Sequence, residues 1–502
     1  MFQLYVALAV LAVCVYYKWY CSYWRRTGNI DGPQPLPLFG NMFEQIVGRK
    51  HFGEIFEEIY REYPTASWIG IYELFNKPAI VVRDLELVKE VLVGNFQSYN
   101  KNLFEIDERI DPLLAANPFT QSGEQWKKTR SQVVPIFSAS KIRTTLPVIE
   151  NVAENFLDYV DRTRESNPDF EAKEICAKYT IDVVASCAFG IDAESFTNPN
   201  AEFRQMCFQI FNPSSIFPWI RAMLTIFAPK VASILRIPFV PKTVDQWFRK
   251  LVAEIIRQRK QGTKRQDMFQ AMYDSLSQNG SIDVKSNEIV GHSVTFLTEG
   301  FETSSTLMSH LLFELASNQK IQDRVFNEIS AVSKEYDGKL TDEAVQKLNY
   351  LERAMYETLR MHSAVFTLSK MCTKEIELPA QYPTDSKRVV IKPGMSAIIP
   401  VRAIHYDPEI YPDPTRFEPD RFLEENKQAR HRYAFLGFGE GPRICLGMKF
   451  GLTQSKVGIA KLLSKYRVKL SSKQQLPLEF EKKAFLLTAK NGIWINFEER
   501  TH

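Results

Sequence analysis

The chain has 502 residues, of which 45% are hydrophobic and 24% are charged, and its formal net charge is +4. This composition is typical of a globular protein with a large core, and the small net charge argues against a nucleic-acid partner. The seven cysteines include no Cys-x-x-Cys pair, and their odd number argues against a disulfide framework, so a reducing, cytosol-facing compartment fits best.

The amino terminus has the pattern of a membrane anchor. Residues 1–17 carry no charge, and Lys18 is the only charged residue before Arg25. At about 1.5 Å per residue, a helix over residues 1–24 would cross a bilayer core. Aromatic and basic residues follow the apolar run, which favours a lumenal amino terminus and a cytosolic body. A cleaved signal peptide is the alternative, but no basic residue precedes the run, and we favour a retained single-pass signal anchor.

Residues 25–50 form a basic, proline-rich segment that includes Gly32–Gly40. Proline-rich segments are stiff and extended, so we expect a hinge that orients the body on the membrane. The apolar spacing in His51–Tyr63 predicts a helix, and Ser67–Tyr72 with Ala79–Val82 predicts a hairpin.

The rest of the chain reads as mainly helical. Residues 84–377 are largely helical, with breaks at Pro112, Pro118 and Pro213, and 287–316 should be a long central helix because it is apolar and lacks proline. Short strands are expected at 388–401, about a Pro-Gly turn, and at 468–498, with a helix at 447–466. The predicted fold is mainly α with small β-sheets, in one catalytic domain over residues 51–502.

Cys445 lies in the most informative segment, the decapeptide 438–447 (FGEGPRICLG). Its glycines let the backbone approach a flat ligand, amides of the following helix can hydrogen-bond the sulfur and keep it anionic, and Arg443 adds a cation. These groups suit haem, with Cys445 as axial ligand of the iron. A buried structural cysteine is one alternative; a nucleotide-binding loop is another, but Pro442 breaks its glycine pattern.

Phe438, Gly441, Arg443, Cys445 and Gly447 match the pattern Phe-x-x-Gly-x-Arg-x-Cys-x-Gly, and in this the chain resembles the cytochrome P-450 family. The resemblance implies that family's fold, haem b as cofactor, Cys445 as the ligand of the iron, and Phe438 and Arg443 as further haem contacts.

Trp126 and Arg130 are one helical turn apart, so an aromatic donor and a guanidinium can clamp one carboxylate. The resemblance places this pair on a haem propionate. A surface arginine beside a half-buried tryptophan is the plain alternative. Lys370 stands where relatives often have an arginine on the second propionate.

Glu357 and Arg360 have the spacing of an ion pair on a helix. The resemblance implies that both join Arg421 in a buried network that holds the Cys445 loop. We expect its role to be structural, and its loss to abolish haem incorporation.

The segment Glu299-Gly300-Phe301-Glu302-Thr303 lies within the predicted central helix. The resemblance implies that Gly300 lets the helix pass close to the haem, and that Thr303 and Glu302 are catalytic, handling oxygen and protons. A threonine bonded to its own helix is the alternative. Glu299 stands where the family usually has a small residue. It could form an ester with a haem methyl, as in fatty-acid hydroxylase relatives, or face a polar substrate group or water.

The implied reaction is insertion of one atom of O2 into a lipophilic substrate, with electrons from NADPH through a membrane-bound reductase and cytochrome b5 as a second partner. The resemblance is greatest to microsomal insect members that act in detoxification, which implies the endoplasmic reticulum membrane. An oxygen-independent haem-thiolate isomerase or dehydratase and a haem-binding sensor or carrier are the competing interpretations. The substrate could be a xenobiotic, an insecticide, a hormone or a fatty acid, and residues 207–240 are apolar enough to cap its pocket.

Overall fold

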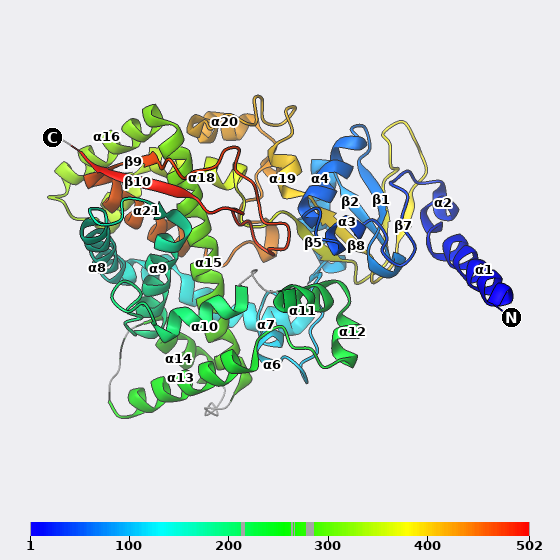
Figure 1. The fold of residues 1–502 in the computed structure, drawn as a ribbon, viewed down its shortest axis with the longest axis horizontal. Helices are drawn as coiled ribbons and strands as arrows, with labels where there is room; N and C mark the ends of the chain where they lie inside the picture. Colours follow the sequence, from blue (N-terminus) through cyan, green and yellow to red (C-terminus); the bar gives the residue numbers. More distant parts are fainter. Residues whose placement is uncertain (1, 212–215, 263–264, 266, 278–285, 501–502) are drawn as a thin grey trace.

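The computed structural model describes the whole chain except residues 1, 212–215, 263–264, 266, 278–285 and 501–502. Most of the body is helical, and a sheet with its covering helix α4 occupies the end nearest the amino terminus (Figure 1). The predicted mainly α fold with small sheets is confirmed. The break expected at Pro213 lies outside the described residues.

The helices account for most of the residues between the strands and build the larger part of the body. Their bounds are α1 Phe2–Tyr20, α2 Tyr23–Gly28, α3 Phe43–Ile46, α4 Phe52–Glu62, α5 Leu85–Lys89, α6 Pro112–Ala115, α7 Gly123–Val133, α8 Ala139–Thr163, α9 Ala172–Val184, α10 Glu202–Phe211, α11 Ile216–Phe227, α12 Pro229–Ile234, α13 Lys242–Lys260, α14 Met268–Ser277, α15 Asn287–Ser317, α16 Gln319–Glu335, α17 Asp342–Lys347, α18 Asn349–Met361, α19 Val401–His405, α20 Glu424–Ala429 and α21 Met448–Lys465.

The strands form small sheets, and the largest has the order β1-β2-β8-β5-β3. β1 and β2 are the predicted hairpin, antiparallel with Gly70 opposite Ile80. β9 and β10 pair antiparallel near the carboxyl terminus. The bounds are β1 Trp68–Tyr72, β2 Pro78–Val82, β3 Lys101–Asn102, β4 Phe170–Glu171, β5 Leu368–Met371, β6 Ile376–Leu378, β7 Val389–Ile391, β8 Ser396–Ile399, β9 Tyr466–Leu470 and β10 Trp494–Glu499.

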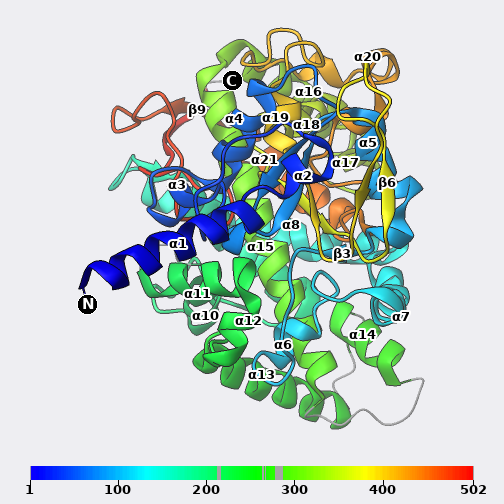
Figure 2. The ribbon, with the colours of Figure 1, turned by 90° about the vertical axis from the view of Figure 1, so that its right-hand side faces the viewer.

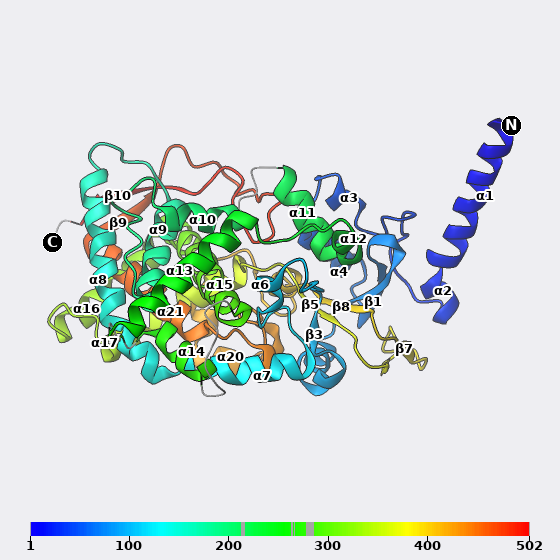
Figure 3. The same ribbon diagram turned by 90° about the horizontal axis from the view of Figure 1, so that it is seen from below.

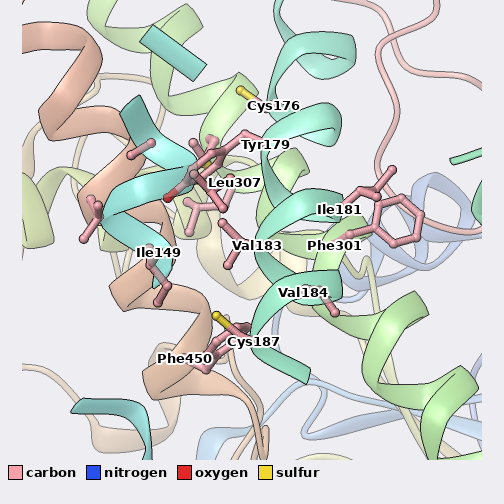
Figure 4. Close-up of a cluster of buried hydrophobic side chains, with 14 of the residues drawn as sticks. Ile149, Cys176, Tyr179, Ile181, Val183, Val184, Cys187, Phe301, Leu307 and Phe450 are labelled. Carbon is pink, nitrogen blue, oxygen red and sulfur yellow. The ribbon is translucent and has the colours of Figure 1, made fainter. Parts of the chain in front are cut away.

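The long helix α15 runs through the middle of the body, as its apolar, proline-free sequence predicted (Figure 1). It begins where the Ser286 hydroxyl accepts a hydrogen bond from the Glu288 amide, a common way to start a helix. α9 and α21 pack against it, and α8 packs on α9 and α21, in the largest hydrophobic core, which includes Tyr179, Leu307 and Phe450 (Figure 4). Because α15 is buried on nearly all sides, it is a rigid platform for a site.

The amino-terminal segment differs from expectation at Trp24, which was placed at the end of the anchor. Its indole nitrogen donates to the Ile71 carbonyl at 2.8 Å, and its ring packs on Trp68, so Trp24 belongs to the body. Gly32 lies directly against Gly70 of β1, so this part of the predicted spacer is docked on the sheet.

Helix α1 projects away from the body (Figure 3). Within the described part of the chain, no helix combines the length and the apolar character that crossing a membrane requires. A membrane span at residues 1–24 therefore stays a prediction.

Candidate active site

The loop that carries Cys445 is a tight turn that needs its glycines. Gly439 and Gly441 have φ angles of 69° and 77°, which favour glycine. A Cβ atom on Gly441 would lie 2.3 Å from the Leu92 carbonyl oxygen. The Cys445 amide donates to the Phe438 carbonyl at 2.9 Å, which closes the turn. The loop therefore presents the cysteine in one fixed direction.

The Cys445 thiol is closely surrounded by protein. Its residue has accessible surface, yet the surrounding protein raises the pKa of the thiol to about 11. Backbone hydrogen bonds from Gly447 and Met448, at the start of α21, and the charge of Arg130 act in the opposite direction. Burial outweighs them where no metal is present, while the amide hydrogen bonds expected from the start of α21 are there. A bound metal cation would supply the charge that favours a thiolate.

Arg130 and Arg443 meet beside this loop. Arg130 of α7 donates to the Ile444 carbonyl at 2.7 Å. The Arg443 guanidinium lies 4.5 Å from the centre of the Trp126 ring, a cation–π distance. The same guanidinium donates to three backbone carbonyls, those of Asn100, Pro118 and Gln121.

Lys370 is the third cation of this cluster. It lies on β5 opposite Asn102 of β3, and its Nζ donates to the Asn102 side-chain oxygen at 2.6 Å. Burial and the charge of Arg443 lower the pKa of Lys370 to about 7. Burial and Arg130 likewise lower the pKa of Arg443 to about 10.

The cation cluster of Arg130, Lys370 and Arg443 fits a dianionic ligand. Across the described residues, no carboxylate forms an ion pair with any of the three. Like charges withdrawn from water are unfavourable unless an anion compensates them. The two propionates of haem would supply that charge beside a cysteine suited to hold its iron, so these residues fit haem.

The opposite wall of the site is a short accessible window in α15. From Ile289 to Ala316 every residue is buried except Glu299, Gly300 and Thr303, which share one face of the helix. The charge of Glu299 raises the pKa of the Cys445 thiol, so the window and the sulfur are within electrostatic range of each other.

Glu299 and Thr303 are connected through the backbone. The Thr303 hydroxyl donates to the Glu299 carbonyl oxygen at 2.8 Å, the helix-internal bond considered above as an alternative. The Glu299 carboxylate accepts from the Asn117 side chain at 2.9 Å. Burial raises the pKa of Glu299 despite this bond, which favours the protonated acid.

Glu302 faces a different neighbour. Its carboxylate forms an ion pair with Lys173 of α9 at 3.0 Å, and its side chain is buried. Glu302 precedes Thr303 in the sequence, but its side chain points to Lys173 of α9. At Gly300 a Cβ atom would lie 3.0 Å from Val184, so the glycine permits close approach of α9, and its expected place beside the haem stays a prediction.

The residues of the predicted network lie together. Arg360 is fully buried and donates two hydrogen bonds to Glu357, at 2.7 and 2.9 Å, and Arg421 reaches the same carboxylate at 3.2 Å. Arg421 also donates to the carbonyls of Pro412 and Asp413. The network therefore joins α18 to the segment that precedes the Cys445 loop.

His405 was missed by sequence reasoning and completes this connection. Its Nδ1 lies 2.9 Å from the Arg360 carbonyl, and its Nε2 accepts from the Leu436 amide at 2.9 Å. Since the Leu436 carbonyl accepts from Gly439, His405 ties the network to the loop. A lone histidine after a strand gives no sequence signal of such a role.

An accessible cysteine below a window in a central helix, beside uncompensated cations, defines the site of a haem-thiolate protein. The family model for cytochrome P450 matches residues 30–496. The chain is 36% identical to a probable cytochrome P450 308a1 of Drosophila melanogaster over 100% of this chain and 99% of that protein. It is 31% identical to cytochrome P450 6B7 of Helicoverpa armigera over 99% and 97% of the two chains.

The chain belongs to the cytochrome P450 family, which confirms the resemblance and makes it a haem-thiolate monooxygenase whose cofactor is haem. The isomerase and carrier interpretations are thereby set aside.

Proposed function

We propose that this protein is a membrane-bound monooxygenase that oxidises lipophilic substrates with electrons from NADPH, delivered by cytochrome P-450 reductase and, as a second donor, cytochrome b5. The observation that carries the proposal is the accessible window of Glu299, Gly300 and Thr303 in α15, whose Glu299 acts electrostatically on the Cys445 thiol. We place the haem between them. Haem in that space would supply oxygen activation, and a thiolate ligand favours cleavage of the oxygen–oxygen bond.

The chain's own residues would hold the cofactor from several sides. Cys445 would bind the iron, and Phe438 would border the ring from the loop. Trp126 and Arg130 would bind one propionate, while Arg443 and Lys370 complete the positive surroundings. Charge-assisted hydrogen bonds of this kind are the strong ones, and the cations are already desolvated.

Thr303 and Glu302 would handle protons on the oxygen side. The Thr303 hydroxyl is accessible in the window, where it can donate to a reacting oxygen atom after it releases the Glu299 carbonyl. Glu302 is held by Lys173, whose side chain is 22% exposed, so this ion pair joins the interior to solvent. The pair is suited to carry protons inward.

Glu299 is the proposed point of a covalent haem bond. An ester would replace one hydrogen of a haem methyl with a carboxyl oxygen, a two-electron oxidation for which the enzyme's own O2 and NADPH supply the oxidant. Acid extraction followed by mass measurement tests this: we expect the polypeptide to retain the mass of haem, and Glu299→Gln to lose it. Complete extraction from the unsubstituted protein would leave Glu299 as a group that faces substrate or water.

Apolar side chains near the window favour a lipophilic substrate. The Phe104 ring lies 5.1 Å from that of Phe119 and 5.8 Å from that of Phe485, and the Phe119 amide donates to Asn117, the partner of Glu299. A xenobiotic, an insecticide, a hormone or a fatty acid would find such a surface complementary. Displacement of the iron-bound water by candidate compounds, seen as a Soret shift, would identify the class.

Association with the endoplasmic reticulum membrane rests on residues 1–24 and on exposed apolar groups elsewhere. Ile220 of α11, Ile234 of α12 and Leu235 are exposed, as are Leu36 and Leu38 in the proline-rich segment. In Figure 2, which looks along the molecule from the α1 end, α11 and α12 lie below α1 in the projection. Exposed apolar surface of this kind is suited to a bilayer. Lys127, Lys128 and Lys449 are exposed and would form a basic docking face for the reductase.

A reduced sample exposed to carbon monoxide tests the function directly. We expect the absorption spectrum of a thiolate-ligated haem, and we expect Cys445→His to give that of an imidazole-ligated haem. An imidazole-type spectrum from the unsubstituted protein, or no bound pigment, would contradict the proposal.

A further inference from the structure

Three consecutive carbonyl groups of α15, next to the window, accept hydrogen bonds from side chains of other helices. Gln454 of α21 donates to the Gly300 oxygen at 3.1 Å. Thr180 of α9 donates to the Phe301 oxygen at 3.0 Å, and Lys173 of α9 donates to the Glu302 oxygen at 2.8 Å. Carbonyls inside a helix are normally satisfied by amides of the same helix, so these are additional bonds.

These donors are themselves fixed in place. Gln454 and Thr180 are fully buried. The Gln454 side chain also donates to the Ser304 hydroxyl at 2.8 Å, and its backbone carbonyl accepts from Tyr179 at 2.8 Å. A carbonyl oxygen can only accept, so the amide nitrogen of Gln454 must be the atom that faces Gly300. Figure 4 shows Tyr179 and Phe301 where these helices meet.

Packing alone does not account for a buried glutamine at this point. The Gln454 side-chain oxygen has no hydrogen-bond partner within the described residues, which is a cost that an apolar side chain would avoid. The residue also lies on the helix whose first turn binds the Cys445 sulfur through Gly447 and Met448. One helix thus contacts both the sulfur and the opposite wall of the site.

We propose that Gln454, Thr180 and Lys173 are positioning residues that hold the α15 window at a fixed place relative to Cys445. This inference rests on the proposed function, since it concerns how that site is kept in register. By fixing the backbone from Gly300 to Glu302, the three donors set the direction of the Thr303 hydroxyl. Misplacement of a reacting geometry by about 1 Å can cost on the order of 100-fold in rate.

Gln454→Leu and a matched control, Gln322→Leu, test the proposal. Gln322 is also fully buried, and its side chain also bridges α15 to another element, donating to Leu315 and Val468 at 2.9 and 2.8 Å. Leu315, however, lies far along the helix from the window. Both variants therefore lose an equivalent buried bridge to α15, but only one loses it at the site.

In the full-length, haem-loaded protein, two readouts separate position from stability: the infrared stretching frequency of bound carbon monoxide, and peroxide released per NADPH. For Gln454→Leu we expect a shifted or broadened band and roughly a ten-fold rise in peroxide released per NADPH. For Gln322→Leu we expect a lower melting temperature with both readouts unchanged. Equal behaviour of the two variants, or an unchanged band in Gln454→Leu, would overturn the inference.

If Gln454→Leu does not fold, two variants of Thr180 test the same proposal. Thr180→Val keeps the shape and loses the donor, whereas Thr180→Ser keeps the hydroxyl. We expect the band shift in the valine variant and its rescue in the serine variant; a shift in neither or in both would contradict the proposal. Whatever the variants show, a thiolate-type spectrum of the unsubstituted protein supports the proposed function. The positioning role can therefore fail while the proposed function stands.

Discussion

His405 joins Arg360 of α18 to the Cys445 loop. The amide of Leu436, 31 residues further along the chain, donates to the Nε2 of His405. Its Nδ1 carries the hydrogen, since the Arg360 carbonyl opposite can only accept. Burial and the charge of Arg360 lower the pKa of His405 to about 3, so the ring stays neutral and keeps both bonds at physiological pH. The ring also stacks on Phe435 at 5.5 Å, which fixes its plane.

We predict that His405→Ala loses most of its bound haem and is markedly less stable. The change leaves a buried carbonyl and a buried amide without partners, each worth about 1–3 kcal/mol, and opens a cavity beside Phe435. Haem content per polypeptide and the melting temperature measure the effect. His431→Ala is the control, because His431 is partly exposed and also accepts from a nearby amide, that of Tyr433. Equal haem loss in the two variants would contradict the assigned role.

A local motif with unusual spacing made Cys445 and Arg443 predictable. The spacing of Glu357 and Arg360 is common, and that pair was predictable only from its place before Arg421 and the Cys445 loop. His405, Asn102, Asn117 and Gln454 gave no such signal. Each acts on a residue that is distant in the chain, and the partner becomes known only when the fold brings the two together. The direction of Glu302 toward Lys173 was hidden for the same reason.

At the scale of elements, the turn before Cys445 depends on one crowded glycine. Gly441 has a φ of 77°, and its α-carbon is so close to the Leu92 carbonyl that a Cβ atom would lie 2.3 Å from the oxygen. Gly338 has the same φ of 77° but nothing within 4 Å of such an atom. The two positions therefore share the backbone strain and differ only in the clash.

We predict that Gly441→Ala is more destabilising than Gly338→Ala, by about 1–3 kcal/mol, the usual range for overpacking. Only the Gly441 change should reduce haem content, because only that turn presents Cys445. Urea midpoints and haem content of the two variants provide the comparison. Equal losses would mean that the turn can relax away from Leu92.

Sequence patterns predicted elements well where pairing is local and poorly where it is not. The hairpin of β1 and β2 followed from two apolar runs around a short turn. Strands were also expected about the Pro-Gly turn near Gly394, and they form, but not as a hairpin. β7 pairs with β6, and β8 pairs with β2 and β5, because the large sheet accepts β8 as an inner strand.

At the scale of the whole molecule, buried histidines determine the response to acid. Burial lowers the pKa of His51 and His292 to about 4, and that of His405 to about 3, from an ordinary value of 6.5. Below pH 6.5 the unfolded chain binds protons that the folded protein does not, so stability falls as pH falls. His310, whose pKa burial lowers well below 6.5, acts in the same sense as these histidines. Buried carboxyls act in the opposite sense, since burial raises the pKa of Asp182 to about 6 and also raises those of Glu73, Asp111, Glu171 and Glu299. The histidines act from pH 6.5 downward, before Asp182 does.

We predict that the urea midpoint decreases steadily from pH 7 to pH 5. Each buried histidine contributes up to about 1.4 kcal/mol per pH unit to this loss. His292→Leu should reduce the histidine contribution to the slope by about a quarter, since it removes one of the four groups. A midpoint that is flat or rises toward pH 5 would show that the carboxylates dominate.

The cation cluster of Arg130, Lys370 and Arg443 has a consequence for the life of the protein before its cofactor arrives. In the haem-free protein these three cationic side chains repel one another where little water reaches them. Binding of any anion there is therefore favourable. Without an anion, local opening of the strands and turns that carry the three residues is favoured. Cofactor supply would then act as a folding signal, since a ligand that binds only the native state raises its stability in proportion to the logarithm of its concentration. Cells short of haem would accumulate less of this enzyme because the vacant form is the one that proteases can reach.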